Sequence, residues 1–155
     1  MSTKCAYYKI KKHKFKIEYS NEFVISIKKI NNDEKISDNQ RSWLSDMVKN
    51  QLEEYFDGKR KEFDFKYKLY GTNFQIKVWK YLSTIPYGET RSYKDVSIAI
   101  NKPKSYRAVG NANNKNPIVI VIPCHRVIKS NKKIGGYGLG IEMKNDLLNH
   151  ELKKI

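Results

Sequence analysis

A run of five β-branched residues constrains the fold of this chain most strongly. Residues 118–122 read Ile-Val-Ile-Val-Ile, a length and composition typical of a buried strand. Pro123, Cys124 and His125 follow the run directly. A thiol and an imidazole at the end of a buried strand predict a reactive pocket. The glycines that follow predict a flexible wall whose backbone can approach a ligand closely. These glycines are Gly135, Gly136, Gly138 and Gly140.

A carboxylate near the C-terminus is the natural partner for this imidazole. Residues 142–152 are predicted to form a closing helix, with Glu151 on its inward side. A carboxylate that holds one nitrogen of His125 makes the other a better base for Cys124. Adjacent side chains of an extended segment point to opposite faces, so contact between Cys124 and His125 needs either a turn or a bridging water. The alternatives are a buried inert thiol, a core histidine and a frayed surface carboxylate.

The rest of the chain predicts an α+β protein with two domains. Alternating apolar residues predict an antiparallel hairpin over residues 15–27, and helical spacing predicts a helix over 43–56. We therefore expect a small sheet-plus-helix domain over residues 1–65. Residues 66–155 are expected to form a mainly helical domain that carries the Cys-containing segment.

Two capping signals divide the second half into helices. Thr72 with Gln75 opens one helix, and Ser92 with Asp95 opens a shorter one. Another short helix is predicted over about 105–113. Two short helices around a polar turn resemble a helix-turn-helix, although a plain helical hairpin gives the same pattern.

The charge balance favours a polyanionic partner for the second half. The chain of 155 residues carries a formal net charge of +15, of which residues 71–155 supply +10 and residues 1–70 supply +5. Nucleic acid is the first expectation, and a lysine-rich solvated surface is the alternative. The length excludes a large multidomain machine, and the apolar runs are too short to span a bilayer.

The cysteine count and the N-terminal residues point to a reducing compartment. The chain begins without a secretory signal, so we expect an intracellular protein, cytoplasmic in a prokaryote and nuclear in a eukaryote. Cys5 and His13 supply at most two zinc ligands, so no metal site is expected.

At these motifs the chain resembles the O6-alkylguanine-DNA alkyltransferases, also called methylated-DNA–protein-cysteine methyltransferases. The resemblance runs from Gly71 to Glu151. Its most specific element is Ile-Pro-Cys-His-Arg-Val at 122–127. Supporting motifs are Gly-Thr-Asn-Phe-Gln at 71–75, Ile-Pro-Tyr-Gly at 85–88, Arg-Ala-Val-Gly at 107–110, Asn-Pro at 116–117 and Gly-Gly-Tyr at 135–137.

The resemblance implies a single-turnover repair reaction without a cofactor. An alkyl group would move from O6 of guanine in duplex DNA to Cys124, with His125 as a base acting through water and Glu151 orienting it. Tyr93 would donate toward N3 of the guanine, and Asn116 would hold the turn beside the site. The alternative for Tyr93 is an amphipathic core aromatic.

The resemblance also implies a set of DNA contacts. Arg107 would occupy the space left by a flipped base, and small residues would let the helix-turn-helix approach the minor groove. The expected substrate and DNA residues are Arg107, Ala108, Gly110, Ala112, Ser92, Val127, Tyr137, Gly138 and Lys144. Tyr137 could instead be a core aromatic, and Arg107 and Lys144 solvated charges. Tyr106 departs from the family pattern, in which small residues are common at this position.

Two other functions compete with this interpretation. A non-catalytic helix-turn-helix protein that binds or senses lesions would explain the charge but leave Cys124 unused. A thiol hydrolase would use Cys124, His125 and Glu151, but the basic second half argues against it. We expect a monomer that binds double-stranded DNA containing O6-alkylguanine and does not bind membranes.

Overall fold

The chain forms two compact units with an α+β fold. The computed structural model describes residues 2–36, 38–133 and 140–152. The first unit comprises Met1–Tyr70 and Pro117–Val119, and the second comprises Gly71–Asn116 and Ile120–Ile155. The sequence placed the boundary after residue 65, whereas the units meet at Tyr70–Gly71 and three residues of the later chain join the first unit. No described helix combines the length and apolar character needed to cross a membrane.

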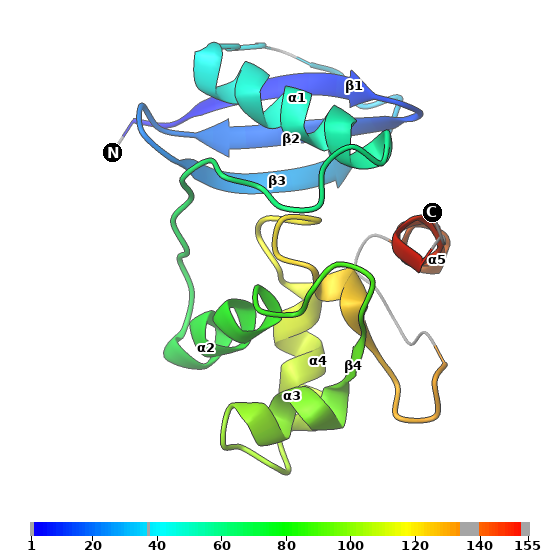
Figure 1. Ribbon diagram of the computed structural model, residues 1–155. Helices are drawn as coiled ribbons and strands as arrows, with labels where there is room; N and C mark the ends of the chain where they lie inside the picture. Colours follow the sequence, from blue (N-terminus) through cyan, green and yellow to red (C-terminus); the bar gives the residue numbers. More distant parts are fainter. Residues whose placement is uncertain (1, 37, 134–139, 153–155) are drawn as a thin grey trace. The chain divides into compact units, whose positions relative to one another are not determined.

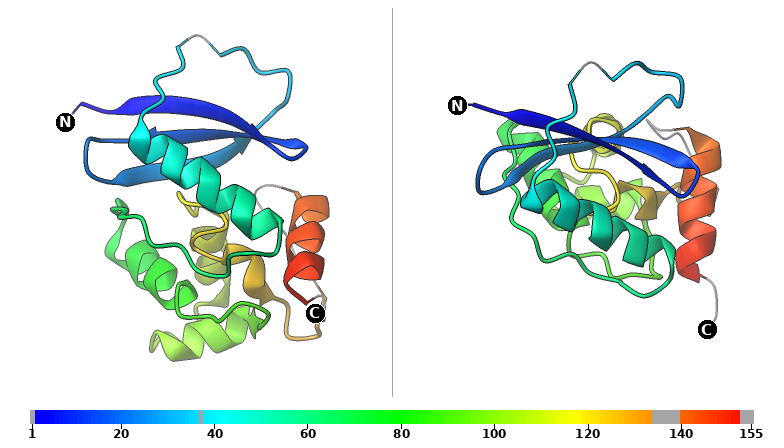
Figure 2. Two further views of the ribbon diagram at one scale, coloured as in Figure 1. Left: turned by 45° about the horizontal axis from the view of Figure 1, so that its top comes forward. Right: turned by 90° about the horizontal axis from the view of Figure 1, so that it is seen from above.

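Within the described residues, the first unit is a three-stranded antiparallel sheet with one helix. Strands β1 (Lys4–Ile10), β2 (His13–Tyr19) and β3 (Val24–Ile30) pair in sequence order, and α1 (Trp43–Phe56) lies against the sheet (Figures 1 and 2). Alternate side chains of the strands are buried with one face of α1. The predicted hairpin and helix are therefore confirmed, and β1 was missed.

The described part of the second unit carries four α-helices. They are α2 (Asn73–Leu82), α3 (Tyr93–Ala99), α4 (Tyr106–Asn114) and α5 (Ile141–Leu152). The capping boxes at Thr72 and Ser92 both form as predicted. α4 packs against α2 and α3 (Figure 1). Strand β4 (Arg91–Ser92) pairs in parallel with β5 (Val127–Ile128), and thereby joins the start of α3 to the segment that follows Cys124.

The β-branched run is buried, but it does not form the predicted strand. Ile118 makes an isolated bridge to Ile27, with Val119 N donating to Ile27 O at 3.2 Å. The backbone then turns at Ile120, whose φ of 72° is rare for a β-branched residue. Asn116 Nδ2 donates to Ile122 O at 2.6 Å and holds the turn from within. The predicted burial of the run is confirmed, since four of its five side chains are at most 5% exposed. Burial does not require an extended chain, so the predicted strand did not follow from it.

Candidate active site

The cysteine and the histidine lie on a single tight turn. Cys124–Arg126 form the 3-10 helix η1 between the turn at Ile120 and β5. Cys124 is 2% exposed, and the His125 side chain is fully buried. Asn113, on α4, donates from Nδ2 to Cys124 O at 3.1 Å and ties the turn to the helix. In a strand, the side chains of Cys124 and His125 would point to opposite faces, and the turn lifts this constraint.

Glu151 on α5 joins His125 and Arg126 in one buried cluster. Glu151 Oε2 lies 2.6 Å from His125 Nε2. Arg126 donates from Nε to Glu151 Oε1 at 2.7 Å and from Nη2 to Oε2 at 3.1 Å. The third guanidinium nitrogen, Nη1, donates to Ile85 O at 2.6 Å, in the loop after α2. Both carboxylate oxygens are thus hydrogen-bonded, so the predicted inward position of Glu151 is confirmed.

The cluster fixes the protonation states of its members. Burial alone would raise the pKa of Glu151, but hydrogen bonds and charges from His125 and Arg126 outweigh it and bring the pKa to about 2. Burial lowers the pKa of His125, although Glu151 opposes the shift. An ionised carboxylate has no proton to give, so His125 Nε2 carries the proton and Nδ1 is left as the basic nitrogen. Among the described residues, none forms a hydrogen bond with Nδ1.

A lysine and a tyrosine complete the buried polar group around Cys124. Lys144 of α5 is fully buried and donates from Nζ to Tyr93 OH at 3.4 Å. Burial lowers the pKa of Lys144 to about 8, while the nearby charge of Cys124 acts in the opposite direction. Burial and the charge of Cys124 both raise the pKa of Tyr93. Cys124 therefore lies within electrostatic reach of both side chains, which come from different helices.

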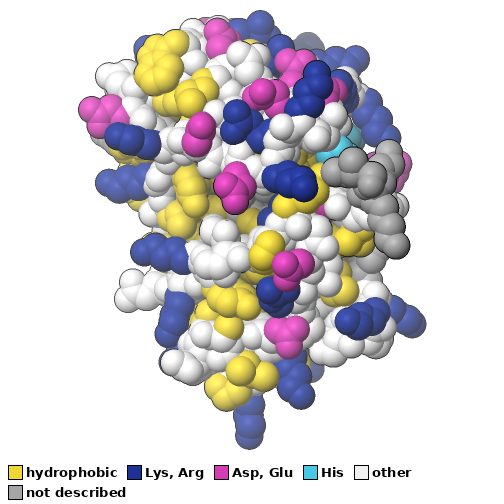
Figure 3. Space-filling view, viewed as in Figure 1, with side chains coloured by type: hydrophobic (Ala, Val, Ile, Leu, Met, Phe, Trp, Pro, Cys, Tyr) yellow, Lys and Arg dark blue, Asp and Glu magenta, His cyan; other side chains and the backbone are white. Residues whose placement is uncertain are grey.

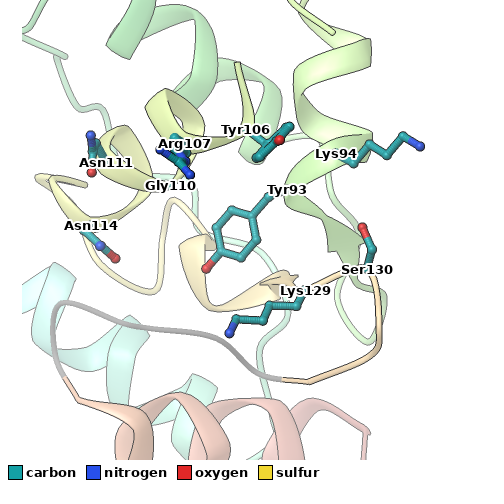
Figure 4. Close-up of a pocket in the computed structure, with 9 residues that line it drawn as sticks. All are labelled: Tyr93, Lys94, Tyr106, Arg107, Gly110, Asn111, Asn114, Lys129 and Ser130. Carbon is teal, nitrogen blue, oxygen red and sulfur yellow. The ribbon is translucent and has the colours of Figure 1, made fainter. Parts of the chain in front are cut away.

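An open pocket of about 540 Å³ adjoins Tyr93 (Figure 4). Helices α3 and α4 form its walls together with residues 129–130. None of the described residues that line it is acidic. The lining residues are Tyr93, Lys94, Tyr106, Arg107, Gly110, Asn111, Asn114, Lys129 and Ser130. The Tyr93 ring lies 3.9 Å from the position that a Cβ on Gly110 would occupy, which is an ordinary contact distance, so Gly110 borders the ring of Tyr93 in this pocket.

A second, more polar pocket of about 310 Å³ shares Lys94, Lys129 and Ser130 with the first. Ser92, expected to contact DNA, lies in its wall. Two further cations, Arg91 and Lys132, also line it. Figure 3 shows Lys and Arg side chains projecting from the surfaces of both units.

Most of the expected site residues lie near Cys124 or in the walls of the two pockets. Cys124, His125, Glu151, Tyr93 and Lys144 come together, Asn116 supports the turn, and Arg107 and Gly110 line the first pocket. Val127 is buried in β5 and Ala108 is exposed on α4. Tyr137 and Gly138 lie outside the described residues. Ala112 needs correction as a surface contact, because it is 2% exposed and its carbonyl accepts from Trp79 Nε1 at 2.8 Å.

Sequence reasoning missed two supporting residues, Arg126 and Asn113. Arg126 stood inside the most specific motif, and the cost of a buried carboxylate was a signal that a cation must lie nearby. Asn113 carried no comparable signal. Among the described residues, no group of three or more His, Cys, Asp and Glu side chains is placed to hold a metal ion.

The family model and the sequence relatives that match this chain point to the same protein family. Residues 73–153 match the family model described as 6-O-methylguanine DNA methyltransferase, DNA binding domain. A methylated-DNA–protein-cysteine methyltransferase of Methanosarcina barkeri is 57% identical over 101 residues, which cover 65% of this chain and 64% of the relative. One of Mycobacterium tuberculosis is 55% identical over 104 residues, 67% of this chain and 62% of the relative. The matched segments thus span slightly less than two thirds of these relatives.

Solved structures extend the likeness to nearly the whole chain. A crystal structure of the Mycobacterium tuberculosis O6-methylguanine methyltransferase superposes with a TM-score of 0.87 and 36% identity, covering 97% of this chain and 93% of that one. The structure of Mycobacterium tuberculosis OGT in complex with DNA gives a TM-score of 0.82 and 40% identity, over 90% of this chain and 86% of that one. The family match, the sequence relatives and the superposed folds agree, and the chain belongs to the O6-methylguanine DNA methyltransferase family.

Proposed function

We propose that this protein repairs O6-alkylguanine in duplex DNA by moving the alkyl group onto its own Cys124, once per molecule. The observation that carries the proposal is the buried arrangement of Cys124, His125 and Glu151. An ionised Glu151 fixes the tautomer of His125, and this leaves Nδ1 as the basic nitrogen of the residue that follows Cys124. The family and the names of its relatives support the same reaction.

The reaction proceeds by displacement at the alkyl carbon. His125 Nδ1 takes the thiol proton through a bridging water, and the thiolate sulfur attacks the alkyl carbon. The bond from sulfur to carbon forms as the bond from carbon to O6 breaks, and its electron pair moves into the guanine. Tyr93 OH then donates a proton toward guanine N3. The hydrogen bond from Lys144 to Tyr93 OH favours this donation, because a cation stabilises the developing phenolate.

The product explains why the protein acts once. Sulfur in the alkylated cysteine is a neutral thioether, which has no good leaving group under these conditions. The protein is therefore both the catalyst and the stoichiometric acceptor.

Burial of the sulfur determines how DNA must bind. Cys124 is 2% exposed, so it cannot reach O6 of a base that stays in the helical stack. The base must be extruded toward the pocket between α3 and α4, and Arg107, which lines this pocket, would fill the gap. Lys94, Lys129 and Lys132 lie around the two pockets and would neutralise backbone phosphates. The protein acts as a monomer in this scheme.

Peptide mass after reaction with DNA tests the proposal. The protein is mixed with a duplex that contains one O6-methylguanine, and an unmodified duplex is the control. We expect one added methyl group, confined to the Cys124 peptide, with no more than one per molecule. Cys124→Ala should take up none, while its affinity for the duplex stays close to that of the parent.

A different result would favour the competing function. Duplex binding without a methyl adduct on the parent protein would overturn the transfer reaction and leave a lesion-binding protein. Repeated release of methylated product with an unmodified Cys124 would instead indicate a turnover enzyme.

A further inference from the structure

An exposed aromatic side chain stands at the start of α4 without a role in the reaction described above. Tyr106 is 53% exposed, although most of the large aromatic residues of the described chain are more deeply covered. It lines the 540 Å³ pocket together with Tyr93 and Arg107 (Figure 4). Its place in the sequence is immediately before Arg107.

The surface around Tyr106 suits a polyanion. The α4 residues that line the pocket are Tyr106, Arg107, Gly110, Asn111 and Asn114. Successive positions in this set are one or three residues apart, so they form one face of the helix. Lys94 and Lys129 add two cations from neighbouring segments, and no described lining residue is acidic. A nucleic-acid backbone held by these cations would bring its bases to the same face of α4.

Cations alone do not account for an aromatic ring at this position. Phosphate contacts need charge and hydrogen-bond donors, which Arg107, Lys94 and Lys129 already supply. A base that leaves the stack exposes the flat faces of its neighbours, and these faces lose their stacking partners. Aromatic side chains recover this loss, because every base presents a π-face. Tyr106 combines the required ring, exposure and position beside Arg107.

We propose that Tyr106 stacks on a base next to the extruded nucleotide and so strengthens binding to lesion-containing duplexes over intact ones. The inference rests on the proposed function, since it requires a base that leaves the stack. Its ligand is an unstacked nucleobase of duplex DNA. Arg107 and Tyr106 then have different roles at adjacent positions of α4. The guanidinium of Arg107 fills the gap, and the ring of Tyr106 stacks on the neighbouring base.

Binding in a non-reacting background tests the inference. Cys124→Ser prevents transfer, so equilibrium affinity can be measured for a duplex with O6-methylguanine and for its unmodified counterpart. In this background we expect Tyr106→Ala to weaken lesion binding by about tenfold, as typical for one stacked base. Binding to the unmodified duplex should change much less. Tyr106→Phe should retain the parent affinity, because the ring remains.

A fluorescent base reports stacking directly. 2-Aminopurine placed beside the lesion should be more strongly quenched by the parent protein than by Tyr106→Ala. Trp43→Ala is the matched control, because Trp43 is 71% exposed and is also the first residue of a helix, but lies in the first unit. This control should change neither affinity nor fluorescence. Circular dichroism and the thermal midpoint show whether each variant is folded.

The outcomes separate the inference from the proposed function. Equal losses in Tyr106→Ala and Tyr106→Phe would assign the effect to the hydroxyl and overturn stacking. An unchanged preference for the lesion in folded Tyr106→Ala would also overturn it. If the parent protein with Cys124 takes up methyl groups in the mass experiment while Tyr106→Ala binds like the parent, the inference alone fails. If the parent takes up none, the proposed function itself fails.

Discussion

The two units bury different kinds of polar side chain. In the described part of the first unit, the buried polar residues are uncharged, and the ion pairs lie at the surface. These buried residues are Ser20, Ser26, Ser45 and Gln51. Besides Cys124, the described part of the second unit buries four ionisable residues together, namely His125, Arg126, Lys144 and Glu151. Burying charge is costly even when it is paired, so the second unit has retained an arrangement that apolar packing would replace without loss of stability.

The difference indicates where chemistry imposes its own requirements. The sheet and α1 need only a dry apolar core to fold. The turn at Cys124 must in addition hold a base, a carboxylate and a cation in fixed positions. A fold under selection for stability alone would have little reason to keep them there, and the predictions below test this contrast from the largest expected effect to the smallest.

Glu151→Gln should produce the largest loss of stability. The substitution leaves the buried Arg126 without its counter-charge, and breaking a buried pair in this way costs about 3–5 kcal/mol. Glu53→Gln removes one member of the surface pair with Lys49 and should cost less than about 0.5 kcal/mol. Urea unfolding followed by far-UV circular dichroism of the whole chain measures the cost of both substitutions. Equal costs for the two substitutions would erase the contrast.

Lys144 should make stability rise with pH in the alkaline range. Its folded pKa is about 8 and its ordinary value is 10.5, so the unfolded chain holds the proton more tightly between these values. Folding therefore becomes more favourable as pH rises from 8 to 10.5, and Lys144→Met should remove this rise.

Lys11 in the first unit should make stability fall as pH rises, which is opposite to the effect of Lys144. Its hydrogen bond with Asp57 raises the pKa of Lys11, so the stability from this pair is present at lower pH and lost as pH rises through that pKa. In unfolding curves measured across pH 7 to 11, the stability of Lys11→Met relative to the parent should rise with pH, and that of Lys144→Met should fall. Parallel curves would contradict the prediction.

Helix capping should not distinguish the units. Ser42 caps α1 and Thr72 caps α2, each in a complete capping box. Replacing either residue with alanine should lower the free energy of unfolding by about 1 kcal/mol. Thermal unfolding of the two variants measures this. A much larger cost at Thr72 would mean that the second unit is sensitive throughout, and not only at its buried charges.

The smallest effect should appear in the salt dependence of DNA binding. Lys94→Ala should reduce the slope of log affinity against log salt by about 0.9, the value for one lost phosphate contact. Lys28→Ala, an exposed lysine on β3, is the matched control and should leave the slope unchanged. Fluorescence anisotropy with an unmodified duplex at several salt concentrations gives both slopes. An equal reduction by Lys28→Ala would indicate that charge acts without regard to position.

Local signals in the sequence predicted much of this structure. The alternation in β2, the spacing in α1 and the capping boxes at Thr72 and Ser92 all depend on neighbours within a few residues, and all were confirmed. The alternation expected for β3 was wrong in part, because Val24 and Ser26 are buried while Ile25 is only partly covered. β1 was missed because its alternate buried residues lie among lysines and tyrosines that also suit a solvated segment.

Long-range contacts set the limits of sequence reasoning. The turn at Ile120 is held by Asn116 and by the bridge to Ile27, and neither partner is apparent from the run of β-branched residues. The inward position of Glu151 was predictable from helical spacing. Its second partner, Arg126, was not identified, because only the folded chain brings the guanidinium to both carboxylate oxygens.

The short segment Pro117–Val119 has a consequence for how this protein can be divided. It belongs to the first unit, although the residues on both sides of it belong to the second. A reading frame that began at Gly71 would encode every side chain of the buried cluster, yet it would leave Ile118 and Val119 without the strand residue Ile27 that they pair with. The reactive half is therefore not a portable module. Recombination between relatives would have to exchange β3 together with the cysteine turn.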